Sequence, residues 1–152
     1  MCYVLNTNNI IRIKIIEKLE ESSYFPLVKN IAPNQSGVYI LYHKNELVYI
    51  GKSTKNSRKS IRTMRQRINE HYDKLMKVSL YDMKLQYLTF TNDWLIPAVE
   101  NFLISHYNPI WNESGFGCKV PGQGRPGTHR INDWNKKYSD NTKKLSILEL
   151  FV

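Results

Sequence analysis

Apolar residues recur at helical spacing in three stretches of this chain. Ile11, Ile15 and Leu19 lie one turn apart with charged residues between them, which predicts a helix over residues 8–22. A second helix is expected from Lys59 to about Met76, with its apolar stripe formed by Ile61, Met64, Ile68, Tyr72 and Leu75. A third is expected to begin after Asn92 or Asp93, either of which could cap it, and to end near Tyr107 before Asn108-Pro109.

Shorter stretches rich in β-branched and aromatic residues predict strands. Residues 38–42 and 47–50 are separated by the polar residues 44–46, which predicts a hairpin. Residues 84–91 predict a third strand, and the stretch from Pro26 to Gly37 is expected to be a connector. The order helix, hairpin, helix, strand, helix, loop predicts a small α/β (α+β) sandwich around a three-stranded sheet.

The C-terminal part of the sequence has a different character. Residues 113–130 interleave glycines with basic residues, which is typical of a loop rather than a core element. A short terminal helix is possible over residues 142–151. The total length of 152 residues favours one compact domain.

Positive charge is concentrated in one part of the sequence. The formal net charge is +9, and residues 52–77 hold nine Lys or Arg against two Asp or Glu. Such a surplus suits a polyanion, most simply nucleic acid, although a merely soluble basic protein is the alternative.

The cysteines and histidines do not indicate a zinc or redox site. Cys2 and Cys118 form no CxxC pair, and the four histidines lack zinc-finger spacing with them. This usage fits a reducing cytoplasm, with a single disulfide left open. We expect no signal peptide and no membrane span, because Arg12 and Lys14 interrupt the best apolar run.

Two helical positions suggest chemistry on a phosphate. Arg67 and His71 are four residues apart, so they share a helix face. An arginine can hold a phosphate and a histidine can take a proton near neutral pH, but the two alone fit a solvated basic face better. Glu100 lies in an apolar stripe and needs a partner, either a divalent cation or, more simply, a lysine.

Tyrosine and asparagine residues complete the candidate set. Tyr39 and Tyr49 lie in the predicted hairpin, where most tyrosines are core residues. A phenol with its pKa of about 10 becomes a useful base only beside another base or a cation. Asn112 could hold a turn or orient a catalytic group by hydrogen bonding.

In this order the residues resemble the GIY-YIG nuclease superfamily. Gly37-Val38-Tyr39 is similar to the first motif, with valine in the middle place, and Tyr49-Ile50-Gly51 matches the second. The resemblance covers residues 36–112, the expected catalytic core, and implies an antiparallel sheet. Residues 1–35 would be an N-terminal helical extension and residues 113–152 a basic loop and C-terminal extension of a single domain, 1–152.

The resemblance implies a role for each residue. Tyr39 would be the general base, supported by His71, and Tyr49 would position water or phosphate. Arg67 would stabilise the charge of the transition state. Glu100 would bind one Mg²⁺, with Mn²⁺ as a possible substitute. The remaining residue of the set, Asn112, would orient its neighbours.

The histidine at position 71 and the tail resemble one branch of that superfamily, the small type II restriction endonucleases. The tail residues that carry this resemblance are Gly115-Phe116-Gly117, followed by Pro121-Gly122-Gln123-Gly124-Arg125. The implied activity is sequence-specific, Mg²⁺-dependent hydrolysis of double-stranded DNA by a cytoplasmic homodimer, with a companion DNA methyltransferase and no membrane. Candidate DNA-binding residues are Lys52, Lys55, Arg58, Lys119, Arg125 and Arg130. A homing or repair-type nuclease and a non-catalytic DNA-binding module are the alternatives.

Overall fold

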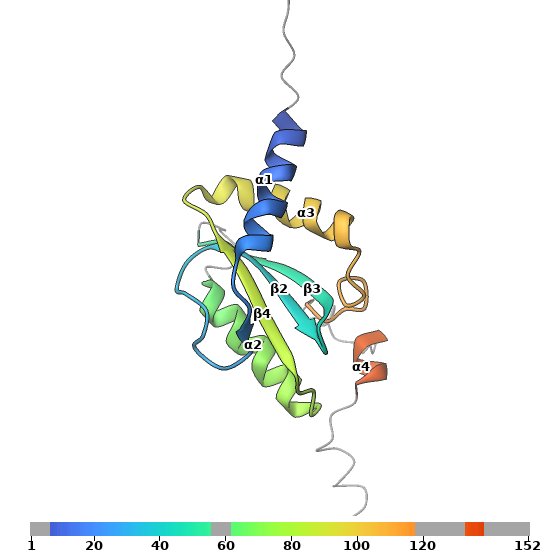
Figure 1. Ribbon diagram of the computed structural model, residues 1–152. Helices are drawn as coiled ribbons and strands as arrows, with labels where there is room; N and C mark the ends of the chain where they lie inside the picture. The colour runs from blue at the N-terminus through green and yellow to red at the C-terminus, as the bar shows by residue number, and fades with distance from the viewer. Residues whose placement is uncertain (1–6, 56–61, 118–132, 139–152) are drawn as a thin grey trace, which may run out of the picture.

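The computed structural model describes residues 7–55, 62–117 and 133–138 (Figure 1). The elements, in chain order, are α1 (Thr7–Glu21), β1 (Phe25–Pro26), β2 (Gly37–His43), β3 (Glu46–Ser53), α2 (Met64–Lys77), β4 (Met83–Thr89), the 3₁₀ turn η1 (Asp93–Leu95), α3 (Ile96–Tyr107) and α4 (Asp133–Lys137). The predicted α/β (α+β) fold with an antiparallel sheet is therefore confirmed.

The described sheet has four strands in the order β1-β4-β2-β3, one more than the three predicted. The additional strand is β1, which pairs antiparallel with β4 through Phe25 opposite Leu85. Phe25 also stacks on Tyr87, with ring centroids 5.4 Å apart. Pro26 is tolerated here because β1 lies at the edge of the sheet, where a missing N–H breaks no ladder. The stretch after it is a connector, as predicted.

The hairpin of β2 and β3 is confirmed and is longer than predicted. Lys44 and Asn45 both have positive φ, at 50° and 66°, as the central residues of a type I′ turn do. This turn matches the twist of the two strands. The turn pairs His43 with Glu46, and a register shift between Leu41 and Tyr42 then places Tyr39 opposite Gly51.

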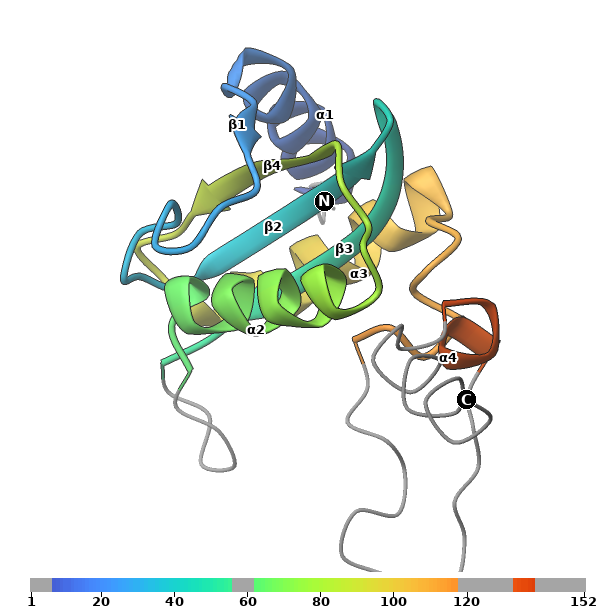
Figure 2. The ribbon, with the colours of Figure 1, turned by 90° about the horizontal axis from the view of Figure 1, so that it is seen from below.

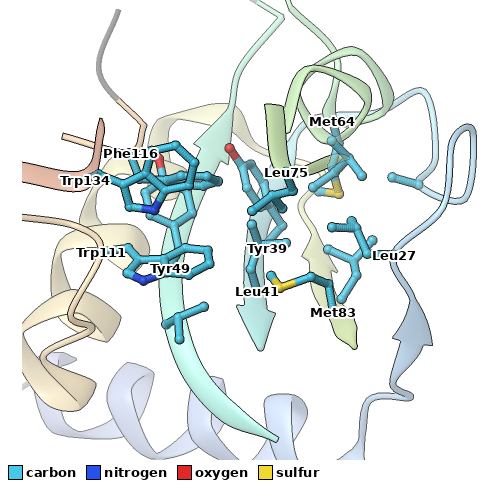
Figure 3. Close-up of a cluster of buried hydrophobic side chains, with 14 residues drawn as sticks. Leu27, Tyr39, Leu41, Tyr49, Met64, Leu75, Met83, Trp111, Phe116 and Trp134 are labelled. Atoms are coloured by element: carbon cyan, nitrogen blue, oxygen red, sulfur yellow. The ribbon is translucent and has the colours of Figure 1, made fainter. Parts of the chain in front are cut away.

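Helices cover both faces of the sheet (Figures 1 and 2). Val38 and Ile40 of β2 pack with residues of α1 and α3, whereas Tyr39 and Leu41 pack with residues of α2. Alternate strand residues point to opposite faces, so both motif tyrosines face α2. Figure 3 shows Tyr39 and Leu41 on this side of the sheet, with Leu75 of α2 nearby.

The predicted start of the second helix at Lys59 was wrong, because α2 begins at Met64. Thr63 ends the preceding segment with a capping box. Its Oγ1 accepts a hydrogen bond from the Gln66 N–H at 3.4 Å, and Gln66 Oε1 accepts one from the Thr63 N–H at 3.0 Å. These bonds satisfy backbone donors at the N-terminus and fix where the helix begins.

The predicted caps of the third helix were also wrong. Asn92 precedes η1 without a side-chain capping bond, and α3 begins after Leu95. Asp93 instead accepts a hydrogen bond from Ser36 Oγ at 3.1 Å, which ties the turn to the start of β2. The Asp93 carboxylate therefore binds a residue next to β2 instead of capping the helix that follows it.

The C-terminal predictions fall largely outside the described residues. Residues 113–117 form turns, while residues 118–132 and the possible helix over 142–151 are not described. The same holds for Cys2 and Cys118. In the described part of the chain, every helix is too short or too polar to cross a membrane.

Candidate active site

The two motif tyrosines come from neighbouring strands and lie side by side. The Tyr39 and Tyr49 ring centroids are 6.2 Å apart, and both side chains are buried. Gly51 is what allows this arrangement. A Cβ atom at Gly51 would lie 2.5 Å from Tyr39 Oη and 2.8 Å from Tyr49 Cε1. The glycine of the second motif thus leaves the space that the tyrosine of the first motif fills.

His71 of α2 meets Tyr39 from above the sheet. Tyr39 Oη and His71 Nε2 are 2.8 Å apart, a hydrogen-bonding distance. His71 is only 5% exposed and is one of the buried residues of α2, which argues against a solvated face at this position. Burial, together with the positive charges of Arg67 and Lys74, lowers the pKa of His71 to about 3. The imidazole is therefore neutral near pH 7, and Nε2 can accept the phenolic hydrogen.

Burial and residues from several elements together set the pKa of the Tyr39 phenol. Tyr39 has no exposed surface, and burial raises the pKa of its phenol well above the usual value. Tyr49 raises this pKa further, Arg67 lowers it and Glu100 raises it. The charges of Arg67 and Glu100 therefore both act at the phenol. In the absence of DNA, Tyr39 holds its proton.

Arg67 lies one turn before His71 and keeps 26% of its side chain exposed. Its guanidinium is 3.9 Å from the Glu70 carboxylate, which also accepts from Arg62 at 2.9 Å. Such exposed pairs contribute little to stability, about 0–1 kcal/mol. The guanidinium thus lies at the border between the buried tyrosine and solvent, where a phosphate could approach.

Glu100 lies on α3, on the opposite face of the sheet from α2, and its charge acts on the Tyr39 phenol. Its side chain is 14% exposed and accepts a hydrogen bond from Lys52 Nζ. Lys52 follows Gly51 in β3 and therefore points to the α3 side, away from the tyrosines. The lysine partner considered from the sequence is thus present. The expected DNA contact of Lys52 stays a prediction, as does metal binding by Glu100.

Glu100 offers the kind of oxygen donor that Mg²⁺ takes. Among residues 7–55, 62–117 and 133–138, no cluster of three or more His, Cys, Asp or Glu side chains could enclose a metal. Mg²⁺ is often held by one or two carboxylates plus water and phosphate, and the Glu100 side chain, which is 14% exposed, could be such a carboxylate.

Asn112 lies on the backbone of the second motif. Its Oδ1 accepts from the Ile50 N–H at 2.9 Å, and its Nδ2 donates to the Ile50 carbonyl at 2.7 Å. Within the described sheet β3 is an edge strand, so these backbone groups point away from β2. Asn112 therefore holds in place the strand segment that carries Tyr49 and Gly51.

Phe116 lies in the site, although the sequence analysis gave it no role there. Its ring stacks on His71 with centroids 4.8 Å apart and meets Tyr49 edge-on at 4.9 Å. Next to it, a Cβ on Gly117 would lie 1.9 Å from Tyr49 Oη. The signal available was an aromatic residue between two glycines in an otherwise polar stretch.

The predicted DNA-binding residues are only partly described. Lys55 is exposed, and its backbone N–H donates to Ser36 Oγ at 2.9 Å. The others, Arg58, Lys119, Arg125 and Arg130, lie outside the described residues. Their contacts with DNA stay predictions.

A family model, the Eco29kI GIY-YIG domain, matches residues 22–142. Among solved structures, the chain is similar to the GIY-YIG N-terminal endonuclease domain of UvrC from Thermotoga maritima bound to magnesium. That similarity has 25% identity and a TM-score of 0.42, and it covers 65% of this chain and 96% of that one. A point mutant of that domain gives 24% identity, the same TM-score, and coverage of 65% of this chain and 94% of that one. No curated protein sequence matches the chain. Because the family model spans most of its length, the chain belongs to the Eco29kI family of GIY-YIG nuclease domains.

Proposed function

We propose that this protein is a sequence-specific endonuclease for double-stranded DNA, of the type II restriction class. The observation that carries the proposal is the buried hydrogen bond between Tyr39 and His71, beside the charges of Arg67 and Glu100. A module that only binds DNA needs cations but has no use for a buried phenol–imidazole pair. Membership of the Eco29kI family supports the restriction role.

In the proposed reaction, two protons move together. The attacking water gives its proton to Tyr39 Oη while Tyr39 passes its own proton to His71 Nε2. The water oxygen bonds to phosphorus as the bond from phosphorus to the leaving oxygen breaks. The leaving oxygen keeps the bonding electron pair and takes a proton from solvent, and His71 afterwards returns its proton to solvent. His71 must be neutral at the start, which its burial ensures. The phosphate brings negative charge to Arg67 and so offsets the positive charge that opposes protonation of His71.

Because Tyr39 has no exposed surface, water reaches its hydroxyl only after a covering group moves. DNA binding is the event that we expect to cause this movement. Arg67 would then stabilise the negative charge that builds up on the phosphate oxygens.

The proposed metal ligand is Glu100, which would hold one Mg²⁺ together with water and phosphate, with Mn²⁺ as a substitute. When bound, the ion supplies positive charge to the phosphate and the leaving oxygen. Lys52, which pairs with Glu100, would release the carboxylate to the metal and become available for a phosphate.

Restriction of a palindromic site calls for two copies of a single-site domain, so we propose a homodimer on DNA. Ile11 and Ile13 of α1 are 42% and 60% exposed, which supports α1 as part of the interface. Sedimentation showing a monomer both free and on DNA would contradict this. A companion methyltransferase and a cytoplasmic location belong to the same proposal.

The testing experiment is cleavage of a long, unmethylated phage DNA by purified protein, with Mg²⁺ or EDTA, beside a Glu100→Ala variant. Discrete Mg²⁺-dependent bands that disappear in the variant would support the proposal and give the recognition site. A smear would instead indicate a nicking or structure-selective nuclease. Salt-sensitive binding without cleavage would indicate a non-catalytic module.

A further inference from the structure

Phe116 touches both aromatic partners of Tyr39. Its ring lies nearly parallel to the His71 imidazole, at 21° and 4.8 Å, and meets Tyr49 edge-on. Phe116 is itself only 2% exposed. Figure 3 shows it beside Trp134, on the side of Tyr49. One face of the imidazole is therefore covered by hydrocarbon rather than by water.

Phe116 is held in place from two directions. Trp111, Trp134 and Tyr138 form with it an aromatic box, in which the Phe116 centroid lies 4.9 Å from Trp111 and 5.0 Å from Trp134. Tyr138 completes the box by packing against both tryptophans. The box joins the turn after α3 to α4, and both of these parts follow the last strand of the sheet in the sequence.

Lys74 ties the box to the helix that carries His71. Its Nζ donates to the Phe116 carbonyl at 2.6 Å and lies 4.7 Å and 4.3 Å from the Phe116 and Trp134 ring centroids. Lys74 is three residues after His71, so both side chains lie on neighbouring positions of one helix face. The ring and the imidazole are thereby fixed to the same element.

We propose that Phe116, anchored by Lys74 and the aromatic box, is a positioning residue that keeps the His71 imidazole neutral and aimed at Tyr39. The proposal rests on the proposed function, because it assigns Phe116 a role in that same site. It also gives the turn after α3 a role in positioning His71, in addition to any contact with DNA.

The charges around His71 explain why this cover matters. Among the described residues, the ionisable groups that act on His71 are Tyr39 and Tyr49 from the sheet and Arg67 and Lys74 from its own helix. Desolvation is the largest cause of its low pKa. Water admitted by loss of the Phe116 ring would solvate an imidazolium, and a protonated Nε2 cannot accept from Tyr39.

The test compares Phe116→Ala and Phe116→Leu with Leu103→Ala, a matched control that truncates a buried residue in the cluster on the opposite face. NMR titration of the His71 Cε1 proton, without DNA, should show no protonation between pH 5 and 8 in the parent and the control. In Phe116→Ala the midpoint should rise toward about 6.5. Phe116→Leu, which keeps most of the apolar volume, should shift less in the same direction and guards against misfolding of the alanine variant.

Cleavage supplies the second readout. Between pH 8 and pH 6, kcat of Phe116→Ala should fall up to about fourfold more than that of the parent, with KM nearly unchanged, because a group that titrates near 6.5 is about three-quarters protonated at pH 6. Leu103→Ala should follow the parent profile. An unshifted His71 titration in both Phe116 variants would overturn the proposal. A shifted titration in a protein that does not cleave DNA would instead uphold the role of Phe116 and refute the nuclease function.

Discussion

The close approach of Gly51 to Tyr39 predicts that Gly51→Ala damages the site more than the fold. The new Cβ would lie 2.5 Å from Tyr39 Oη and 2.6 Å from Tyr39 Cζ. To reach an ordinary contact of 3.4 Å, the phenol must move by about 0.9 Å. That movement is a large part of the 2.8 Å that separates Tyr39 Oη from His71 Nε2.

Two magnitudes follow from this geometry. Overpacking a tight core costs about 1–3 kcal/mol of unfolding free energy, and Tyr39 is fully buried with little room to relax. A misplacement of about 1 Å in a catalytic group can cost on the order of a hundredfold in rate. We therefore expect Gly51→Ala to lower kcat about a hundredfold while the protein stays folded.

The matched control is Gly37→Ala, at the other motif glycine. There a Cβ would meet the Leu88 carbonyl at 2.2 Å and Met64 Cε at 2.5 Å, so it strains the same sheet but not the phenol. Urea unfolding would measure the stability of both variants, and single-turnover cleavage would measure the rate per folded molecule. Gly37→Ala should lose at least as much stability and far less activity.

The reasoning would be refuted if Gly51→Ala cleaved DNA at the parent rate per folded molecule. It would also be refuted if the two glycine variants lost activity in proportion to stability, because the loss would then be a general effect of strain in the sheet.

Three further predictions concern the metal ligand, the histidine and the helix cap. Glu100→Gln should abolish cleavage and weaken Mg²⁺ binding as measured by calorimetry. It should change the unfolding free energy by less than about 1 kcal/mol, because the partner Lys52 is 39% exposed. Unchanged Mg²⁺ binding would contradict the assignment of Glu100 as the metal ligand. The low pKa of His71 in the folded state means that its contribution to stability is present above about pH 6.5 and is lost toward pH 3, at up to about 1.4 kcal/mol per pH unit. Urea unfolding across this range should give a flatter profile for His71→Gln, and equal slopes would count against a buried neutral imidazole. Thr63→Ala should cost about 1 kcal/mol in urea unfolding by removing the capping box of α2, whereas no loss would show that the cap is dispensable.

The sequence predicted those features that depend on local spacing. A four-residue interval was enough to align Arg67 with His71. The common face of the two motif tyrosines was not predicted, because it depends on the register shift between Leu41 and Tyr42. The hairpin was also predictable, since its turn residues are polar and its strands are β-branched and aromatic. These predictions need only the period of a helix or strand.

The features that the sequence did not predict depend on tertiary contacts. β1 has two residues, one of them proline, which is too short to show any period. The start of α2 was predicted too early because the helical pattern of apolar residues continues before Thr63. The spacing of Thr63 and Gln66, which is that of a capping box, was the signal for the true start. Phe116 is 45 positions from His71, so no local pattern could connect them.

The amide of Asn112 has a consequence for how this protein meets other copies of itself. An edge strand offers unpaired backbone groups on which a strand of another molecule can add and begin aggregation. By bonding to both the N–H and the carbonyl of Ile50, Asn112 occupies the middle of that edge. Asn112, which holds the second motif in place, therefore also blocks the pairing of another strand with β3. Such pairing would distort the active site, because β3 carries Tyr49 and Gly51.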